Sequence, residues 1–592
     1  MMDIETLRCD LNDMGEKIKW NWINKDKEKD KGITLRSGKN KRKRTARCRK
    51  PIPPELGAWI NAAKTAILTK VQATNKAYIG REKKYMNEKH LDRIGLRMLR
   101  RSRFKAIMCD KEAGYVLVET DQINNIKLDI LKGKNYKEIS EGELNNKSII
   151  GHVFSIANKI AKAEYEHAGK KISEEIRNGN HNICSEVQMK IKTHKDQGSI
   201  KPRAIHASHK IYTKEMSRWL VDRIIPITRR IKHNAENSRQ AIEKIRAAKV
   251  DENDIMIKVD LEDFYMSGKH GSYESAIKQC VEKEYGTTIA NIAAEVTSFL
   301  LYHQYIKNDC GKNENEIRYW QVQNGSGQGQ IHSGDLADIT YWHMVEDAIL
   351  TTKVKRECGM KAYVRYRDDC LIIAQDPQID REKNIWKVLK RMANKAEQHG
   401  FVVKIEDYDY CETDILDFRI MKGEKWRTTG HLDTEVKWKK TSLGVPLTQK
   451  SGHPPTICKS WPMAELRRVG TLCSSNKTYE ENRTMMVDRL RKYGYSQEIL
   501  RSMENYYPWL AEINKNKTEM KTKVDPEKEI TKIRFITGYH PTTAKVIRKA
   551  IREIHHDVVM VETLENAYGK RDPFRIETAF RNVAKSVGKL VI

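Results

Sequence analysis

Two adjacent carboxylates, Asp368 and Asp369, lie between two runs of mostly apolar, β-prone residues, 362–366 and 370–374. This pattern predicts a β-hairpin that carries both acids at its turn. Two ionised neighbours repel each other, and burying them together is costly unless a cation is bound. The pair therefore suggests a Mg²⁺ site. An exposed acidic turn is the alternative, which these two residues alone leave open.

A second acid follows an apolar run upstream. Residues 255–259 predict a buried strand that ends at Asp260. Phosphoryl transfer with two metal ions needs carboxylates from separate strands that converge on ions about 3.5–4 Å apart. We expect Asp260 and Asp368 to bridge two Mg²⁺ ions, for which Mn²⁺ could substitute, with Asp369 as a secondary ligand. The ions would activate a primer 3′-hydroxyl and neutralise charge on the departing pyrophosphate. An ordinary acid at a strand end is the alternative for Asp260.

A glycine-rich segment, residues 324–338, separates the two acid clusters in the sequence. Glycines let the backbone approach a ligand closely, and the apolar pattern after Ser333 predicts the start of a helix. A simple glycine loop with Ser333 as the helix N-cap is the alternative.

The order of these three clusters resembles that of a reverse transcriptase. Asp260 and Tyr265 resemble palm motif A, in which the aromatic residue excludes a ribose 2′-hydroxyl. Gln328 and Gly329 resemble motif B, which backs the incoming nucleotide and the template. Residues 366–369 resemble the Y-x-D-D box of motif C. The resemblance implies that the three acids are the catalytic and metal-binding residues, and that Tyr265, Gln328 and Gly329 contact the nucleotide.

Three further motifs extend this resemblance. Arg203 resembles the fingers residue that grips the triphosphate, residues 400–404 resemble motif D, and residues 415–420 resemble motif E, the primer grip. The resemblance implies that Arg203 and Lys195 bind the triphosphate, and that Lys404 protonates the pyrophosphate. A planar guanidinium suits phosphate oxygens because it offers several donors in one fork.

The chain is most similar in its motifs to Penelope-like retroelements. Residues 191–195 resemble their P-K-x-H-K box, and residues 451–454 resemble their S-x-H-P box. Residues 465–496 resemble their thumb, and residues 539–591 resemble their post-thumb region. The resemblance therefore covers about residues 190–592.

Two residues depart from the family pattern. Arg367 replaces the small or apolar residue usual in Y-x-D-D, and Gln328 stands where many such elements have Met. An RNA-dependent RNA polymerase is a rival, but it usually carries a second acid near the position of Tyr265. A group II intron or other non-LTR reverse transcriptase, and a domesticated nucleic-acid-binding derivative, are further alternatives. We find no endonuclease motif and no RNase H acid constellation.

The composition agrees with a nucleic-acid enzyme. The chain has 592 residues and a formal net charge of +30, which suits a polyanionic partner. A merely soluble basic protein is the alternative. Expected partners are template RNA, a DNA primer or target DNA, and dNTPs, with an element-encoded RNA in a ribonucleoprotein.

Cysteine spacing and hydropathy indicate the cellular compartment that we expect for the protein. The 11 Cys residues include no C-x-x-C pair, which argues for reduced thiols and against zinc knuckles. No apolar run approaches the length of a membrane span, and the N-terminus lacks the apolar core of a signal peptide. We therefore expect an intracellular protein, nuclear or cytoplasmic, with no membrane partner.

These motifs require particular elements to position them. We expect an α+β right-hand polymerase with fingers, palm and thumb, a helical N-terminal extension and a small helical C-terminal module. The expected segments are a basic, disordered tail at 1–50, a helical extension at 51–180, fingers at 181–250, palm at 251–422, connector and thumb at 423–515, and a basic helical module at 516–592.

Overall fold

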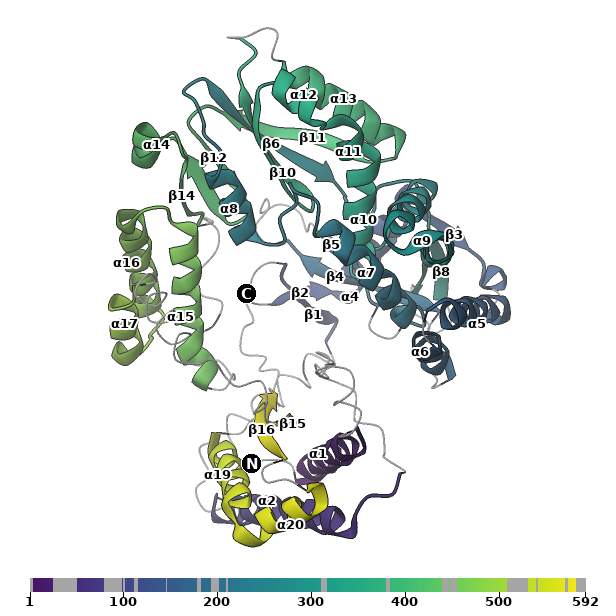
Figure 1. Ribbon diagram of the computed structural model, residues 1–592, viewed down its shortest axis with the longest axis vertical. Helices are drawn as coiled ribbons and strands as arrows, with labels where there is room; N and C mark the ends of the chain where they lie inside the picture. The colour runs from purple at the N-terminus through teal and green to yellow at the C-terminus, as the bar shows by residue number, and fades with distance from the viewer. Residues whose placement is uncertain are drawn as a thin grey trace.

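The computed structural model has a mixed α/β fold, as expected, in which a large body and a smaller terminal module can be distinguished (Figure 1). It describes residues 4–24, 50–78, 98, 102–110, 115–144, 146–164, 166–177, 183–192, 202–208, 211–309, 317–378, 384–438, 447, 455–507, 531–538, 541–569 and 573–581.

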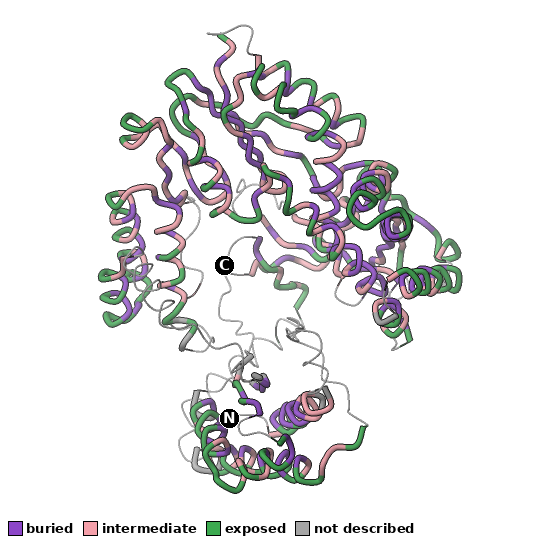
Figure 2. The backbone as a smooth tube through the Cα atoms, viewed as in Figure 1, coloured by how far each residue is buried: buried purple, intermediate pink, exposed green. Residues whose placement is uncertain are grey.

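The central sheet has four antiparallel strands in the order β11-β6-β10-β9. Their bounds are β6 Asp254–Glu262, β9 Met360–Tyr366, β10 Asp369–Gln375 and β11 Val402–Asp409. Strands β9 and β10 form a hairpin, which confirms the prediction made from the two apolar runs on either side of Asp368 and Asp369. Both β6 and β10 are largely buried along their length (Figure 2).

Period-2 alternation gives this sheet two different faces. On β6, Ile255, Ile257, Val259 and Leu261 join the large core with the helices. These helices are α7 Lys214–Thr228, α9 His270–Tyr302, α10 Ser333–Tyr341 and α13 Ile385–Gln398. The acid Asp260 alternates with these apolar residues, so it lies on the opposite face.

That opposite face is covered at one end only. Met256 packs there in a second core with residues of a three-stranded sheet and of a helix that follows it in the sequence. The elements around it are β12 Glu412–Ile415, β13 Phe418–Met421, β14 Asp433–Val436, α8 Ser238–Arg246, α14 Glu424–Thr429 and α15 Pro455–Leu472. Helices α16 Asn476–Lys492 and α17 Gln497–Glu504 pack on α15 through a core of their own.

A five-stranded sheet in the order β3-β8-β7-β4-β5 lies beside the central one. Its strands are β3 Tyr136–Ile139, β4 Cys184–Ile191, β5 Pro202–His206, β7 Tyr305–Asp309 and β8 Ile317–Val322. The surrounding helices are α4 Thr120–Leu131, α5 Asn146–Ala163 and α6 Glu166–Arg177. Short connecting elements are η2 Glu141–Glu143, η3 Trp342–Glu346, α11 Asp347–Ile349 and α12 Thr352–Glu357.

The expected helical extension at 51–180 contains strands as well. The hairpin of β1 Phe104–Met108 and β2 Tyr115–Glu119 approaches β4 through a bridge between Cys109 and Ile191, and β3 pairs with β8. Sequence analysis missed these strands because segments of four or five residues are too short to distinguish a strand from part of a helix.

The terminal module is formed by both ends of the chain. It contains α1 Ile4–Asn24, α2 Pro54–Tyr78, β15 Thr531–Gly538, α19 Pro541–His556, α20 Val558–Tyr568 and β16 Phe574–Arg581. The two ends share one core, in which Trp59 meets Phe574 edge to face with ring centroids 5.5 Å apart. The Trp22 indole also donates a hydrogen bond of 3.0 Å to the Ala567 carbonyl.

Two expectations are corrected by this module. The tail at 1–50 was expected to be disordered, but helix α1 forms because Leu7, Leu11, Met14 and Ile18 make one buried apolar stripe. The C-terminal module was expected to be helical, but it also contains the parallel strand pair β15 and β16. The basic run at 39–50 lies outside the described residues except for Lys50.

None of the helices in the described part of the chain combines the length and the apolar character that crossing a membrane requires.

Candidate active site

Four side chains that the sequence singled out lie in one row across the central sheet. In the strand register, Asp369 is opposite Asp260 on β6 and opposite Tyr366 on β9, and Asp260 is opposite Lys404 on β11. Directly opposite residues of antiparallel strands point to the same face. The row Tyr366–Asp369–Asp260–Lys404 therefore lies on the face that the helices leave open.

The third acid lies at the tip of the β9–β10 hairpin. The turn needs a left-handed residue, and Arg367 supplies it with φ +57°. The Leu261 amide donates a 3.0 Å hydrogen bond to the Asp368 carbonyl, which ties the tip to the end of β6. The structure thus brings Asp260 together with Asp368 and Asp369, which follow it by more than 100 residues in the sequence.

The charge of this acid group is poorly compensated. Burial, followed by the negative charges of Glu406, Asp368 and Asp369, raises the pKa of Asp260 to about 6. The nearest cations are partly engaged elsewhere: Lys258 binds Glu406 at 2.5 Å, and Lys404 lies 3.4 Å from Glu262. An added cation would therefore be favoured between the acids.

The donor set was tested for its fit to magnesium. Among the described residues, no three His, Cys, Asp or Glu side chains gather closely enough to enclose a metal ion. Mg²⁺ keeps several waters and is usually held by one or two carboxylates together with substrate phosphates. The oxygen-only donors and the raised pKa of Asp260 fit such an ion.

A polar cavity of about 510 Å³ borders this row. Its lining includes Lys258 and Glu406 next to Asp260, and continues to Asp414, Arg419 and Lys437 on the three-stranded sheet. Sequence analysis did not identify Lys258 or Glu406. Glu406 lies two residues after Lys404, where the pairing of β11 with β6 shifts register, and no motif marks it.

One buried and one half-buried arginine fix the hairpin tip. Arg365 is fully buried and contacts Glu346 at 2.7 Å and Asp338 at 2.6 Å. Arg367 contacts Asp335 at 2.9 Å and also pairs with Asp338. Buried charges persist only when they are paired, so these arginines fasten the turn to helix α10. This explains Arg367, which the sequence marked only as a departure from Y-x-D-D.

Tyr265 lies beside this arginine. A Cβ atom at Gly334 would be 3.0 Å from the Arg367 guanidinium and 3.4 Å from the Tyr265 ring, so all three positions are in close contact. Burial raises the pKa of Tyr265 to about 12, with the charge of Asp368 adding to the shift. The phenol is therefore a neutral ring close to the acids.

The glycine-rich loop is fastened to both sheets. The Ser326 amide donates to the Tyr265 carbonyl at 2.6 Å, and the His206 amide donates to the Gln328 carbonyl at 2.7 Å. Gly329 has φ +110°, which favours glycine. Ser333 is not the helix N-cap; its hydroxyl donates to the Gly327 carbonyl at 2.8 Å instead. The loop thereby holds Gln328 and Gly329 between the end of β5 and the segment after Asp260.

Arg203 lies on β5, opposite Lys190 of β4. Its Nε atom is 3.1 Å from an oxygen of Asp110, whose side chain is 6% exposed, while the Arg203 side chain is 30% exposed. Asp110 follows the β1 strand and no motif marks it, so sequence analysis missed it. Lys195 lies outside the described residues, as do residues 451–454 of the S-x-H-P box.

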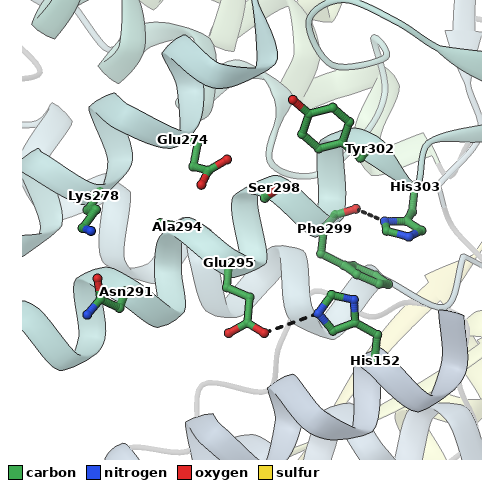
Figure 3. A pocket seen from close by; sticks show the side chains of 10 residues that line it. All are labelled: His152, Glu274, Lys278, Asn291, Ala294, Glu295, Ser298, Phe299, Tyr302 and His303. Atoms are coloured by element: carbon green, nitrogen blue, oxygen red, sulfur yellow. Dashed lines mark hydrogen bonds and ion pairs between the residues drawn. The ribbon is translucent and has the colours of Figure 1, made fainter. Parts of the chain in front are cut away.

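A separate pocket of about 430 Å³ lies between α5 and the two limbs of α9, which turn at Gly286 (Figure 3). His152 of α5 and Glu295 of α9 are 3.3 Å apart across it, and Lys159 also holds Glu295 at 2.7 Å. The helices that line it carry none of the three acids, so it is not part of the acid site.

Comparisons with known proteins add structural similarity at low identity. No protein-family model matches the sequence, and no curated protein matches it. The telomerase from Candida albicans, solved with a fragment of telomeric RNA, is 11% identical, with 81% of this chain and 70% of that chain covered and a TM-score of 0.47. The apo telomerase from Candida tropicalis is 11% identical over 87% and 82% of the two chains, with a TM-score of 0.41. The RNA-dependent RNA polymerase of a human picobirnavirus is 12% identical over 81% and 91%, with a TM-score of 0.39. At these scores the function has to be argued from the residues of this chain.

Proposed function

We propose that this chain is a template-directed nucleic-acid polymerase, and specifically an RNA-directed DNA polymerase. The observation that carries the proposal is the pairing of Asp260 with Asp369 across adjacent strands, with Asp368 at the neighbouring turn. The neighbouring carboxylates and the pKa of Asp260, raised to about 6, support a site for cations.

Asp260, Asp368 and Asp369 would hold Mg²⁺, or Mn²⁺ in its place. When bound, the ions supply charge neutralisation and lower the pKa of the primer 3′-hydroxyl. In the reaction this hydroxyl loses its proton and its oxygen bonds to the α-phosphorus of the nucleotide, while the bond to the pyrophosphate breaks. The carboxylates orient the reacting groups, and Asp260 must give up its proton to do so.

The residues around the acids have separate roles in this proposal. Arg203 would direct its terminal nitrogens to the triphosphate, as Lys195 would, and Asp110 would keep the Arg203 guanidinium oriented. Lys404, in the same row as Asp260, would protonate the leaving pyrophosphate. Gln328 and Gly329 would form the floor of the nucleotide pocket.

Tyr265 supports the use of dNTPs. Its half-buried, neutral ring adjoins Arg367 and lies near the acids, where a ribose 2′-hydroxyl would meet it. An RNA-dependent RNA polymerase would instead need a polar acceptor for that hydroxyl at this position.

The resemblance in motifs supports a Penelope-like retroelement as the source of this enzyme, acting on template RNA with a DNA primer in the nucleus or cytoplasm. A group II intron or other non-LTR reverse transcriptase is the second candidate, and a domesticated nucleic-acid-binding derivative is the third. The acid row disfavours the last, because a protein that only binds nucleic acid gains nothing from clustered carboxylates.

Primer extension on an RNA template tests the proposal. The protein is supplied with Mg²⁺ and either dNTPs or rNTPs, beside an Asp368→Ala, Asp369→Ala variant. Extension with dNTPs that the variant loses by orders of magnitude, while it still binds primer–template, would support a reverse transcriptase. Extension with rNTPs would reassign the chain to the RNA polymerases. Undiminished extension by the variant would refute the assignment of the acids.

A further inference from the structure

Helix α19 of the terminal module has a basic face that none of the proposed active-site roles uses. Lys545, Arg548, Lys549 and Arg552 are exposed and have the spacing i, i+3, i+4 and i+7. This spacing places them on one side of a helix. The opposite side, formed by Ala544, Ile547, Ala550, Ile551 and Ile554, is buried in the core of the module.

The basic face carries a surplus of positive charge. Its neighbouring acid, Glu553, pairs with Lys70 of helix α2 and lies 3.9 Å from Lys549. One carboxylate is thus shared by two lysines from opposite ends of the chain. Lys545 and Arg552 form no ion pair with any residue that the structure describes. Together with Lys70 the face has five cations and one acid.

We propose that this basic face of α19, with Lys70 of α2, binds the phosphate backbone of a nucleic acid at a site separate from the acid row. Seven residues of helix span about 10.5 Å. Phosphates of one strand follow each other at about 3.4 Å along the axis of a duplex, so the stripe matches roughly three of them. The contact would be independent of sequence, because phosphate contacts position a protein without reading bases.

The burial pattern favours nucleic acid over a lipid surface. An amphipathic helix binds a membrane by inserting its apolar side, but the apolar side of α19 is already buried against α2 and β16. Val558 and Val559 at the start of α20 are 70% and 69% exposed, yet two valines offer little area for insertion. The α19 face therefore presents charge without an insertable surface.

Counterion release gives a quantitative test. Binding of the full-length chain to a 30-bp DNA duplex and to a single-stranded RNA is measured as a function of salt, for the wild type and for a Lys545→Ala, Arg552→Ala variant. Each lost phosphate contact should make the plot of log K against log salt shallower by about 0.9 for duplex DNA and about 0.7 for a single strand. The double variant should therefore lose about 1.8 or about 1.4, respectively, and bind the duplex about 30-fold more weakly near 0.15 M salt.

A matched variant removes the same charge elsewhere. Lys132 and Lys353 have side chains 75% and 77% exposed on the main body, and Lys132→Ala with Lys353→Ala should leave the slope unchanged. Alanine is a good helix former, so thermal unfolding should be unaffected in both variants. An equal slope for wild type and the α19 variant would overturn the proposal. So would loss of binding to anionic phosphatidylserine vesicles with the nucleic-acid slope intact, since the face would then be a lipid contact.

Discussion

The ion pair between Asp110 and Arg203 allows a direct test of how the five-stranded sheet would position a residue of the proposed nucleotide site. The change Asp110→Asn keeps the size of the side chain and removes its charge. The contact is an ion pair without a hydrogen bond, since the Asp110 oxygen nearest to Arg203 has no hydrogen-bond partner among the described residues. Breaking a buried ion pair costs about 3–5 kcal/mol. The Arg203 side chain is 30% exposed, so water replaces part of the loss and about 1–2 kcal/mol remains. The expected result is a roughly 5- to 30-fold lower kcat/KM for the nucleotide.

Single-nucleotide incorporation at varied dNTP concentration measures this effect. We expect KM to rise more than kcat falls, because the pair orients Arg203 before chemistry occurs. Asp110→Glu, which restores a carboxylate, should recover part of the loss. A purely structural role for Asp110 would instead lower the thermal unfolding temperature and leave the KM-to-kcat split unchanged.

A double-mutant cycle decides whether Asp110 acts through Arg203. In an Arg203→Ala background, Asp110→Asn should cost little, because the group that it orients is gone. If Asp110→Asn lowers kcat/KM by the same factor with and without Arg203, or if it has no effect in the wild type, the reasoning is refuted.

Two further predictions concern the acids and the hairpin tip. Asp260→Asn should abolish incorporation yet raise the free energy of unfolding by about 1–2 kcal/mol at pH 7.5 without divalent cations, because the folded state disfavours the ionised carboxylate. Because the pKa of Asp260 is raised to about 6, this gain in unfolding free energy should shrink as pH falls from 6 towards 4, where the wild type and the variant are both neutral at residue 260. Chemical denaturation at several pH values measures the gain. A gain that grows in acid would contradict the prediction. Arg367→Met removes two ion pairs to α10, so it should lower the free energy of unfolding by about 1–2 kcal/mol and lower kcat about tenfold. Chemical denaturation measures the first effect and single-turnover incorporation the second. An unchanged kcat would show that activity does not depend on these ion pairs at the hairpin tip.

Local signals made the acid site predictable. Two apolar runs around an acidic pair predict the hairpin. A strand of apolar residues that ends in an acid predicts the face on which that acid lies. The register then places Asp260 opposite Asp369, as the row shows. The motif resemblance added the order of the segments, which periodicity alone does not provide.

Residues that act through distant contacts could not be predicted in this way. Asp110 reaches Arg203 from a hairpin about 90 residues earlier, and Glu406 acts on Asp260 from a strand that comes more than 140 residues later. Arg367 forms ion pairs with Asp335 and Asp338, which belong to helix α10 and lie about 30 residues earlier in the sequence. The shared core of the terminal module was not predicted for the same reason. The N-terminal and C-terminal segments each supply only part of its apolar residues.

The shared core of the two chain ends also has a consequence for biosynthesis. Helix α2 ends at Tyr78 and β15 begins at Thr531, so about 450 residues must be translated before the first helices can meet their partners. At about 5–20 residues per second this takes roughly 20–90 s, during which α1 and α2 can pack only on each other and lack their contacts with β15, α19 and α20. A nascent chain of this protein should therefore depend on chaperones that hold its N-terminus. A protein product truncated before residue 531 would expose apolar residues of α1 and α2, and this exposure would make it a target for degradation.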